Sequence, residues 1–150
     1  MKSDKLRMIL SCTLAVALAA TATAAPWDNS QRLKKVSEAY DTGAVLTVSG
    51  TVGRIYEITP KNSPNYGFHM ILKTAEETLN VHLGPEWYLK GLDGKLAAGD
   101  RVQVTGAMTK ELVAEGKDKI RSLRAAEIQK GGVIVLTLRD KNGKPVWRGY

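Results

Sequence analysis

Apolar and polar side chains alternate along most of the chain after residue 44, which is typical of strands that bury one face. In residues 68–73 the even-numbered positions are apolar, and in residues 78–83 the odd-numbered positions are apolar. The same alternation, bounded by glycine, proline and polar turns, predicts five strands, over residues 44–59, 68–74, 78–83, 101–108 and 120–128. We therefore expect a mainly β protein.

Three further elements are predicted outside these strands. Apolar residues at helical spacing predict an N-terminal helix over residues 28–40. Pro85 suits the first position of a helix and predicts a short one between the third and fourth strands. Asn142-Gly143 lies between two strand candidates, residues 133–138 and 144–148, and predicts a C-terminal hairpin because both turn residues tolerate positive φ.

The order of three strands, a short helix and two strands is that of an OB fold, a five-stranded Greek-key barrel. Gly50 and Gly53 interrupt the first strand, and glycines inside a strand indicate a bulge or a bend. Such a bend lets one long strand coil and close a small barrel. We predict a five-stranded OB-fold-like Greek-key barrel with a short helix between strands 3 and 4, an N-terminal helix and a C-terminal β-hairpin.

The first 25 residues have the pattern of a secretory signal peptide. Basic residues at positions 2, 5 and 7 precede an apolar stretch over residues 8–20, and Ala22-Thr23-Ala24 supplies small residues for the signal peptidase. The apolar stretch is shorter than the roughly 20 residues that a membrane-spanning helix needs. An uncleaved anchor and a lipid anchor at Cys12 are the alternatives. We expect export to the periplasm.

The chain is accordingly divided into a signal peptide, residues 1–25, a helical segment, residues 26–43, and an OB-fold-like domain with its hairpin, residues 44–150. After residue 25 there is no cysteine, which excludes disulfides, thiolate metal sites and a cysteine nucleophile. That part has 19 Lys and Arg against 14 Asp and Glu, a net charge of +5. This charge favours an anionic ligand or a protein of the cell envelope as partner. Nucleic acid is not expected outside the cytoplasm.

The two histidines of the chain are predicted to be neighbours. The apolar residues of the second and third strands must face the same core. A tight turn centred on Ala75-Glu76 achieves this by pairing Phe68 with Leu83, and each following residue of the second strand with the preceding residue of the third. His69 then lies directly opposite His82 on the outer face of the sheet. A register shifted by two residues keeps the core and separates the pair, and is the alternative.

An opposed pair of His69 and His82 suggests a transition-metal site, because neutral imidazole is a good ligand for zinc, copper, nickel and iron. Two ligands do not close such a site, since structural zinc sites use four protein ligands and catalytic sites three. No other cofactor is indicated. The alternative is a solvated polar face on which the two rings pack together.

Basic and aromatic residues are interleaved on the first three predicted strands. Arg54, Tyr56 and Lys73 fall on this surface, and such a mixture is typical of the oligomer-binding face of OB folds. Trp87 and Tyr88 follow the third strand and are further candidate ligand-binding residues. The alternatives are an ordinary solvated surface for the first group and a hydrophobic plug at the base of the barrel for the second.

The sequence shows no constellation that would support catalysis. It has no G-x-S-x-G, no H-E-x-x-H and no phosphate-binding loop. Glu76-Glu77 is a turn pair rather than an acid and a base across a cleft. We therefore do not expect an enzyme.

The strand sequences resemble those of small exported bacterial OB-fold proteins, and the stretch from VHLGPEWYL to LTLRDKNGKPVWRG resembles the periplasmic MamS/MamX-type, magnetosome-associated domain family. The resemblance spans about residues 44–149. It implies a ligand-binding barrel with a non-enzymatic accessory role, linked to iron or redox handling. Only His82, Gly84, Pro85 and Trp87 are carried over from it. The chain has no C-x-x-C-H, so attached haem is not implied.

Three hypotheses for the function follow. The first is a non-catalytic periplasmic binding or assembly module of OB-fold type that uses the outer face of the first three strands. The second is a metal-handling accessory protein for iron, copper or zinc, centred on His69 and His82. The third is a structural partner in an envelope complex that uses the terminal hairpin and Trp147, which is expected either to pack against the barrel or to lie exposed.

Overall fold

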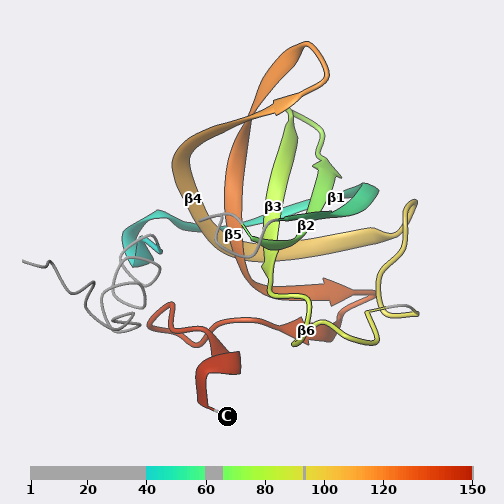
Figure 1. Cartoon of the computed structure of the whole chain (residues 1–150). Coiled ribbons are helices and arrows are strands. Elements are labelled where there is room, and N and C mark those ends of the chain that lie inside the picture. The colour runs from blue at the N-terminus through green and yellow to red at the C-terminus, as the bar shows by residue number, and fades with distance from the viewer. Residues whose placement is uncertain (1–39, 60–65, 93, 150) are drawn as a thin grey trace, which may run out of the picture.

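The computed structural model describes residues 40–59, 66–92 and 94–149 of the chain (Figure 1). Six strands account for most of them, with a short 3-10 helix at each end of the described region. The elements are η1 (Thr42–Ala44), β1 (Val45–Ile58), β2 (Gly67–Lys73), β3 (Thr78–Gly84), β4 (Arg101–Glu115), β5 (Asp118–Lys130), β6 (Val133–Thr137) and η2 (Val146–Gly149). No helix of the described residues is long and apolar enough to cross a membrane.

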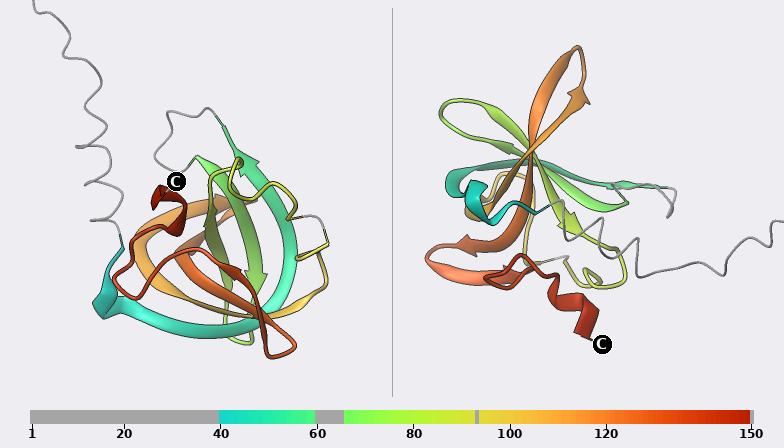
Figure 2. Two further views of the ribbon diagram at one scale, coloured as in Figure 1. Left: turned by 90° about the horizontal axis from the view of Figure 1, so that it is seen from below. Right: turned by 90° about the vertical axis from the view of Figure 1, so that its left-hand side faces the viewer.

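Strands β1 to β5 form a closed barrel. β1 pairs antiparallel with β2 and with β4, β2 pairs with β3, and β4 pairs with β5. A parallel pairing of β3 with β5 closes the ring, which gives the strand order of an OB fold. Figure 2 (left) shows the strands curving round into this ring. β6 is added at the edge of the sheet beside the second half of β5.

The bend predicted in the first strand is present. Residues up to Thr51 pair with β4, residues from Thr51 onward pair with β2, and a bulge lies between Val52 and Arg54. Gly50 is required there because a Cβ on it would lie 3.0 Å from the Leu72 side chain and closer still to the Lys73 carbonyl oxygen. One strand therefore contributes to both sides of the barrel, as a coiled first strand must.

The core fills the barrel with the residues that alternation had assigned to it. Its largest completely buried side chains are Met70, Leu72, Leu79, Leu83, Leu123, Ile128 and Leu138. The pairs Met70–Val81 and Leu72–Leu79 confirm the predicted register of the central hairpin. The predicted Phe68–Leu83 pair is wrong, because a bulge after Phe68 places Gly84 opposite it. Gly67 and Gly84 approach so closely that a Cβ on Gly67 would overlap the Gly84 carbonyl.

The helix predicted after Pro85 is wrong: residues 85–92 form successive turns instead. Pro85 does accept a hydrogen bond from the Leu89 amide at 3.2 Å, which is one helical turn. Gly91 then adopts a φ of +85°, which ends the turn. Leu89, Leu92 and Leu96 are buried from this segment and close one end of the barrel.

The C-terminal hairpin is present only in part. Its predicted turn is formed, since the Gly143 amide donates to the Asp140 carbonyl at 2.9 Å and Arg139 bridges Pro145. Its first predicted strand pairs elsewhere, because residues 133–137 form β6 and pair with β5 across the Gly131-Gly132 turn. Proline has no N–H group, so a ladder cannot continue through it.

The structure describes the predicted β4–β5 pair in full, but not the predicted N-terminal helix. β4 and β5 extend as a long hairpin whose arms are longer than predicted, and it stands out from the barrel at the top of Figure 1. The predicted helix over residues 28–40 lies outside the described residues except for Tyr40.

Candidate functional site

Four polar or aromatic side chains form one row across the outer face of the barrel. Tyr56 on β1 pairs with His69 on β2, His69 pairs with His82 on β3, and His82 pairs with Arg124 on β5. The rings of Tyr56 and His69 are stacked with centroids 5.5 Å apart, and those of His69 and His82 meet edge to face at 4.8 Å. The prediction that the two histidines are neighbours is confirmed. We call these four residues the polar row.

The alternative of a solvated polar face is wrong, although the two rings do pack together. His69 is 2% exposed and His82 is 7% exposed. The parallel pairing of β3 with β5 is part of the reason, because it makes β3 an interior strand of the sheet with neighbours on both sides. The histidine pair is therefore a buried polar group, and its hydrogen bonds matter.

Asn80 ties the row together from a neighbouring position on β3. Its Oδ1 accepts a hydrogen bond of 2.8 Å from the Tyr56 hydroxyl and lies 3.2 Å from Nδ1 of His69. Its Nδ2 donates to Oγ of Ser122 at 3.1 Å. Because an amide oxygen only accepts, the contact assigns the proton of His69 to Nδ1. Asn80 is completely buried, so these bonds fix the orientation of the row.

His82 is held in its neutral form. Burial lowers its pKa well below the ordinary value of 6.5, and the charges of His69, Arg124 and Arg139 lower it further. Its Nε2 lies 3.4 Å from the carbonyl oxygen of Tyr66, which can only accept, so Nε2 carries the proton. Nδ1 is then a lone-pair acceptor, and it is buried with no hydrogen-bond partner.

Arg124 ends the row as a buried cation. It is 8% exposed, and its Nε has no hydrogen-bond partner. Burial lowers its pKa, and the charge of Glu111 offsets this in part, yet no ion pair joins Arg124 to a described carboxylate. Arg124 also lines a hollow of about 610 Å³ between Tyr40, which precedes η1, and the β4 segment around Glu111. The guanidinium group is thus at the border of a space that a ligand group can enter.

The predicted ligand-binding residues separate into three regions. Arg54 and Tyr56 stay together: the Arg54 guanidinium lies 4.4 Å from the centre of the Tyr56 ring and forms a 2.6 Å ion pair with Glu115. Lys73 pairs with Thr51 at the far end of β2 and lines a hollow that neither of them lines. Arg54 pairs with Ile71 and Tyr56 pairs with His69, and both partners lie on the same side of β2 as Lys73, so the three predicted residues share the outer face of the sheet.

Trp87 and Tyr88 form the third region, at the end of the barrel closed by residues 85–96. Tyr88 packs against Trp147 with ring centroids 5.4 Å apart and donates a hydrogen bond to the Thr137 carbonyl at 3.1 Å. Trp147 is 8% exposed and lies against Gly84, so of its two predicted placements the packed one is confirmed. Trp87 is 52% exposed and does not contribute to the plug.

Arg124, Asn80 and Ser122 belong to the site but were not predicted from the sequence. Arg124 has no local signal, since an arginine in an alternating strand is typical of an ordinary surface position. The parallel β3–β5 pairing that places it beside His82 joins segments about forty residues apart. The OB-fold order that we predicted implies this pairing, so aligning residues 79–82 with 121–124 would have identified Arg124 and Ser122.

The histidine pair has no third metal ligand in the part of the chain that the structure describes. No group of three or more His, Cys, Asp and Glu side chains able to hold a metal ion occurs among those residues. The neutral state of His82 does suit a metal ligand, because a protonated imidazole cannot coordinate. The arrangement thus provides hydrogen-bonding groups and one buried cation, with at most two imidazole ligands.

These features define a closed OB-fold barrel with a buried polar row on its outer face. The sequence profile of the MamS/MamX magnetosome protein family matches residues 44–136, which is most of the barrel and β6. The chain belongs to this family. No curated protein matches it.

Solved structures similar to the chain include two single-stranded DNA-binding proteins. Rim1, the mitochondrial protein of S. cerevisiae, is 14% identical with a TM-score of 0.41, covering 59% of this chain and 94% of its own. The small protein of Streptomyces coelicolor is 18% identical with a TM-score of 0.39, covering 57% and 92%. The aspartyl tRNA synthetase of Entamoeba histolytica is 11% identical with a TM-score of 0.42, covering 70% and 21%. The fold assignment rests on the strand pairing of this chain and not on these similarities.

Proposed function

We propose that the chain is a non-catalytic binding module of the periplasm that holds an anionic group of its ligand or partner at Arg124. The observation that carries the proposal is the buried Arg124 guanidinium, which has no ion pair with a described carboxylate and borders a hollow. A buried charge is strongly unfavourable unless it is compensated, and the charge of Glu111 offsets the burial of Arg124 only in part. A carboxylate or phosphate group supplies that compensation and matches the planar guanidinium with two parallel hydrogen bonds.

The rest of the polar row supports the same role. His82 next to Arg124 is neutral and offers an unused acceptor at Nδ1, so it suits a hydroxyl or protonated group beside the anion. Asn80 holds Tyr56 and His69 in fixed positions, which reduces the entropy lost on binding. Arg54 over the Tyr56 ring adds an exposed cation at the other end of the row.

The location and the lack of catalysis are part of the proposal. The N-terminal 25 residues have the sequence pattern of a signal peptide, and the sequence has no motif for a nucleophile with its base. Membership of the MamS/MamX family is consistent with an accessory role in the cell envelope.

Isothermal titration of the purified protein with inorganic phosphate tests the proposal. The matched variants are Arg124→Lys and Arg121→Lys, which make the same chemical change on the same strand; Arg121 is exposed and bound by Glu77. We expect Arg124→Lys to weaken phosphate binding about tenfold, since lysine keeps the charge and loses the two-pronged contact. Equal phosphate affinity in the parent protein and Arg124→Lys, or no binding by the parent, would contradict the proposal.

A second candidate function is the handling of a transition metal by His69 and His82. It is favoured by their direct cross-strand pairing, with ring centroids 4.8 Å apart, and by the neutral state of His82. A partner chain or small ligand would complete the coordination, because two imidazoles do not close a site.

Titration of the purified protein with Cu²⁺, Zn²⁺ and Ni²⁺ tests this candidate. The double variant His69→Ala/His82→Ala removes both imidazoles and should lose saturable binding of whichever ion the parent binds. Because both residues are buried, the fold of the variant is checked by circular dichroism. Unchanged metal affinity in a folded double variant rejects the metal site.

A further inference from the structure

A second hollow, of about 660 Å³, lies over the first half of β1 and shares no residue with the polar row. Its walls come from the bend of β1, the β2–β3 turn, the start of β4 and the β5–β6 turn. The side chains that line it and carry the argument are Ser49, Thr51, Lys73, Arg101, Gln103 and Gln129. We call this hollow the β1 groove. Its volume is within the range of about 300–1,000 Å³ typical of small-molecule sites.

The strand register arranges these six side chains as two rows of three. Thr51 pairs with Lys73 on one side and with Arg101 on the other. Residues opposite each other in a sheet point to the same face, so the two cationic side chains flank the Thr51 hydroxyl. Neighbouring strands are about 4.8 Å apart, which separates the two cationic residues by roughly 10 Å at their Cα atoms.

The second row lies next to the first on the same face. Ser49 is two residues from Thr51 on β1 and pairs with Gln103, which in turn pairs with Gln129. Alternation of side chains places residues two apart on one side of a strand. Gln129 donates from Nε2 to Glu127 at 2.8 Å, and this bond fixes its amide. The row therefore presents one hydroxyl and two amide groups beside the two cations.

The charge of the β1 groove is positive. Lys73 and Arg101 are exposed, neither has an ion pair among the described residues, and no acidic residue lines the groove. Of the nearby carboxylates, that of Glu127 accepts the hydrogen bond from Gln129, and that of Asp100 is held elsewhere. Asp100 accepts hydrogen bonds from Lys130 Nζ at 2.8 Å and from the Ala97 amide at 2.9 Å.

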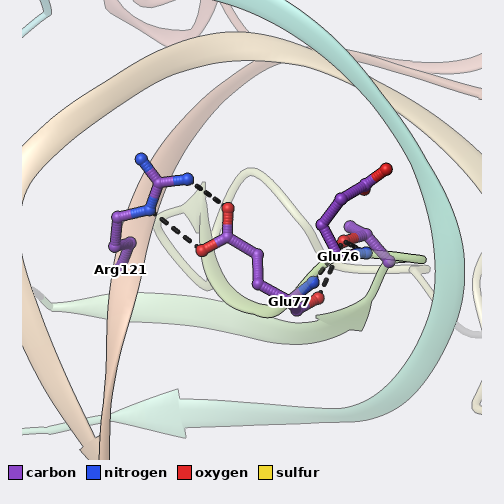
Figure 3. Close-up of polar contacts among 4 residues, drawn as sticks. Glu76, Glu77 and Arg121 are labelled. Carbon is purple, nitrogen blue, oxygen red and sulfur yellow. Dashed lines mark hydrogen bonds and ion pairs between the residues drawn. The ribbon is translucent and has the colours of Figure 1, made fainter.

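The carboxylate of Glu77 in the β2–β3 turn is held by Arg121, as Figure 3 shows. The turn itself is fixed by Thr74, whose hydroxyl accepts from the Glu77 amide at 3.0 Å and donates to its carbonyl at 2.8 Å. This wall of the groove is therefore preformed. The opposite wall is the Gly131-Gly132 turn, where both φ angles are positive and no atom lies within 4 Å of a Cβ built on either glycine.

We propose that the β1 groove binds a phosphorylated sugar, with the phosphate between Lys73 and Arg101 over Thr51 and the sugar hydroxyls on Ser49, Gln103 and Gln129. Two cations and a hydroxyl supply charge-assisted hydrogen bonds to the phosphate oxygens. Amide and hydroxyl side chains each donate and accept, which suits hydroxyl groups that do both. Inorganic phosphate would contact only the row that contains the two cations. A neutral sugar would contact only the row of Ser49, Gln103 and Gln129.

An NMR titration tests this site, with glucose 6-phosphate, inorganic phosphate and glucose as probes at low ionic strength. We expect saturable shifts of the backbone amides around Ser49–Thr51, Gln103 and Gly131-Gly132 with glucose 6-phosphate. Phosphate should bind about tenfold or more weakly there, and glucose should cause no saturable shift, because each satisfies one row only. Equal affinity for glucose 6-phosphate and phosphate at these amides overturns the sugar part of the proposal.

The matched variants are the double substitutions Lys73→Gln/Arg101→Gln and Lys90→Gln/Lys95→Gln. Both remove two positive charges, and the second pair is exposed beside a different hollow. We expect the first to weaken glucose 6-phosphate binding by about a hundredfold and the second to leave it within about twofold. Equal weakening by both variants would mean general charge attraction and would overturn the site. Since Arg124 is intact in both, this result is independent of the proposal for the polar row.

Discussion

His82 on β3 and Arg124 on β5 lie directly opposite each other, and each has a buried side-chain nitrogen without a hydrogen-bond partner. The two atoms are complementary in character, because Nδ1 of the neutral His82 accepts and Nε of Arg124 donates. A ligand that carries an anionic oxygen beside a hydroxyl group satisfies both. Leaving the two nitrogen atoms unpaired costs free energy in the ligand-free protein, and a ligand that pairs them removes this cost. Such behaviour is expected of a binding site.

The stability of the protein should fall as the pH is lowered below 6.5. Burial and nearby cations lower the pKa of His82 in the folded protein, while in the unfolded chain it titrates near 6.5. The unfolded state thus binds more protons below that pH, and the free energy of unfolding decreases by up to about 1.4 kcal/mol per pH unit. Urea unfolding of the parent and of His82→Gln between pH 7.5 and pH 5, roughly the window above carboxylate titration, measures this. A pH dependence that is unchanged in His82→Gln contradicts the assignment.

Arg124→Met should stabilise the protein in the absence of an anionic ligand. Methionine has a similar length and removes a buried charge that has no described ion pair, so we expect a gain of about 1 kcal/mol or more in the free energy of unfolding. Arg139→Met is the control, since Arg139 is also buried but donates to the Ala125 carbonyl at 2.7 Å and lies over the Tyr40 and Trp147 rings. It should destabilise by about 2–3 kcal/mol. Chemical denaturation in phosphate-free buffer distinguishes the two.

Asn80→Leu should disrupt the polar row at a cost of about 2–4 kcal/mol. The change leaves the Tyr56 hydroxyl, Nδ1 of His69 and Oγ of Ser122 without their partner. The Tyr56→Phe variant, which removes only one of these bonds, should cost about 1 kcal/mol. Equilibrium unfolding gives both values, and similar small losses for the two variants would show that Asn80 does not organise the row.

Gly106→Ala should be among the most destabilising single-methyl additions in the barrel. A Cβ there would lie 2.9 Å from Cα of Ala125 and would overlap the Arg124 carbonyl oxygen, at the bulge where β4 crosses β5. We expect a loss of about 3 kcal/mol or more. Gly116→Ala, at a turn with φ of +61° and open space around it, should lose only about 1 kcal/mol. The thermal unfolding midpoints compare the effect of crowding at Gly106 with that of backbone strain at Gly116.

Much of the barrel was predictable because the alternation of apolar and polar residues determines which face of each strand is buried. The core pairs Met70–Val81 and Leu72–Leu79 follow from the requirement that two apolar sets face one core, and the same argument placed His69 opposite His82. The bend in β1 was predicted from glycines inside a strand, and Gly50 is needed there because a Cβ would meet the Leu72 side chain and the Lys73 carbonyl. These inferences need only one or two adjacent strands.

The candidate site was predicted only in part, because its other members come from distant segments. Arg124 and Ser122 are brought to His82 and Asn80 by a parallel pairing, which is part of the reason that the histidines are buried. Lys73 does share the outer face with Arg54, because across the bulge in β1 Arg54 lies opposite Ile71, two residues from Lys73 on the same side of β2. The errors at residues 85–91 and 133–148 arose where a Gly or Pro signal supports more than one turn geometry.

The central claim is that Arg124 is the anchor for an anionic group, and the NMR signal of its own Nε–H group tests it most directly. Inorganic phosphate should shift this signal saturably in the parent protein, with the same dissociation constant as phosphate binding measured by calorimetry, and also in Lys73→Gln/Arg101→Gln. An Nε–H signal that does not move while phosphate saturates the protein would contradict the account.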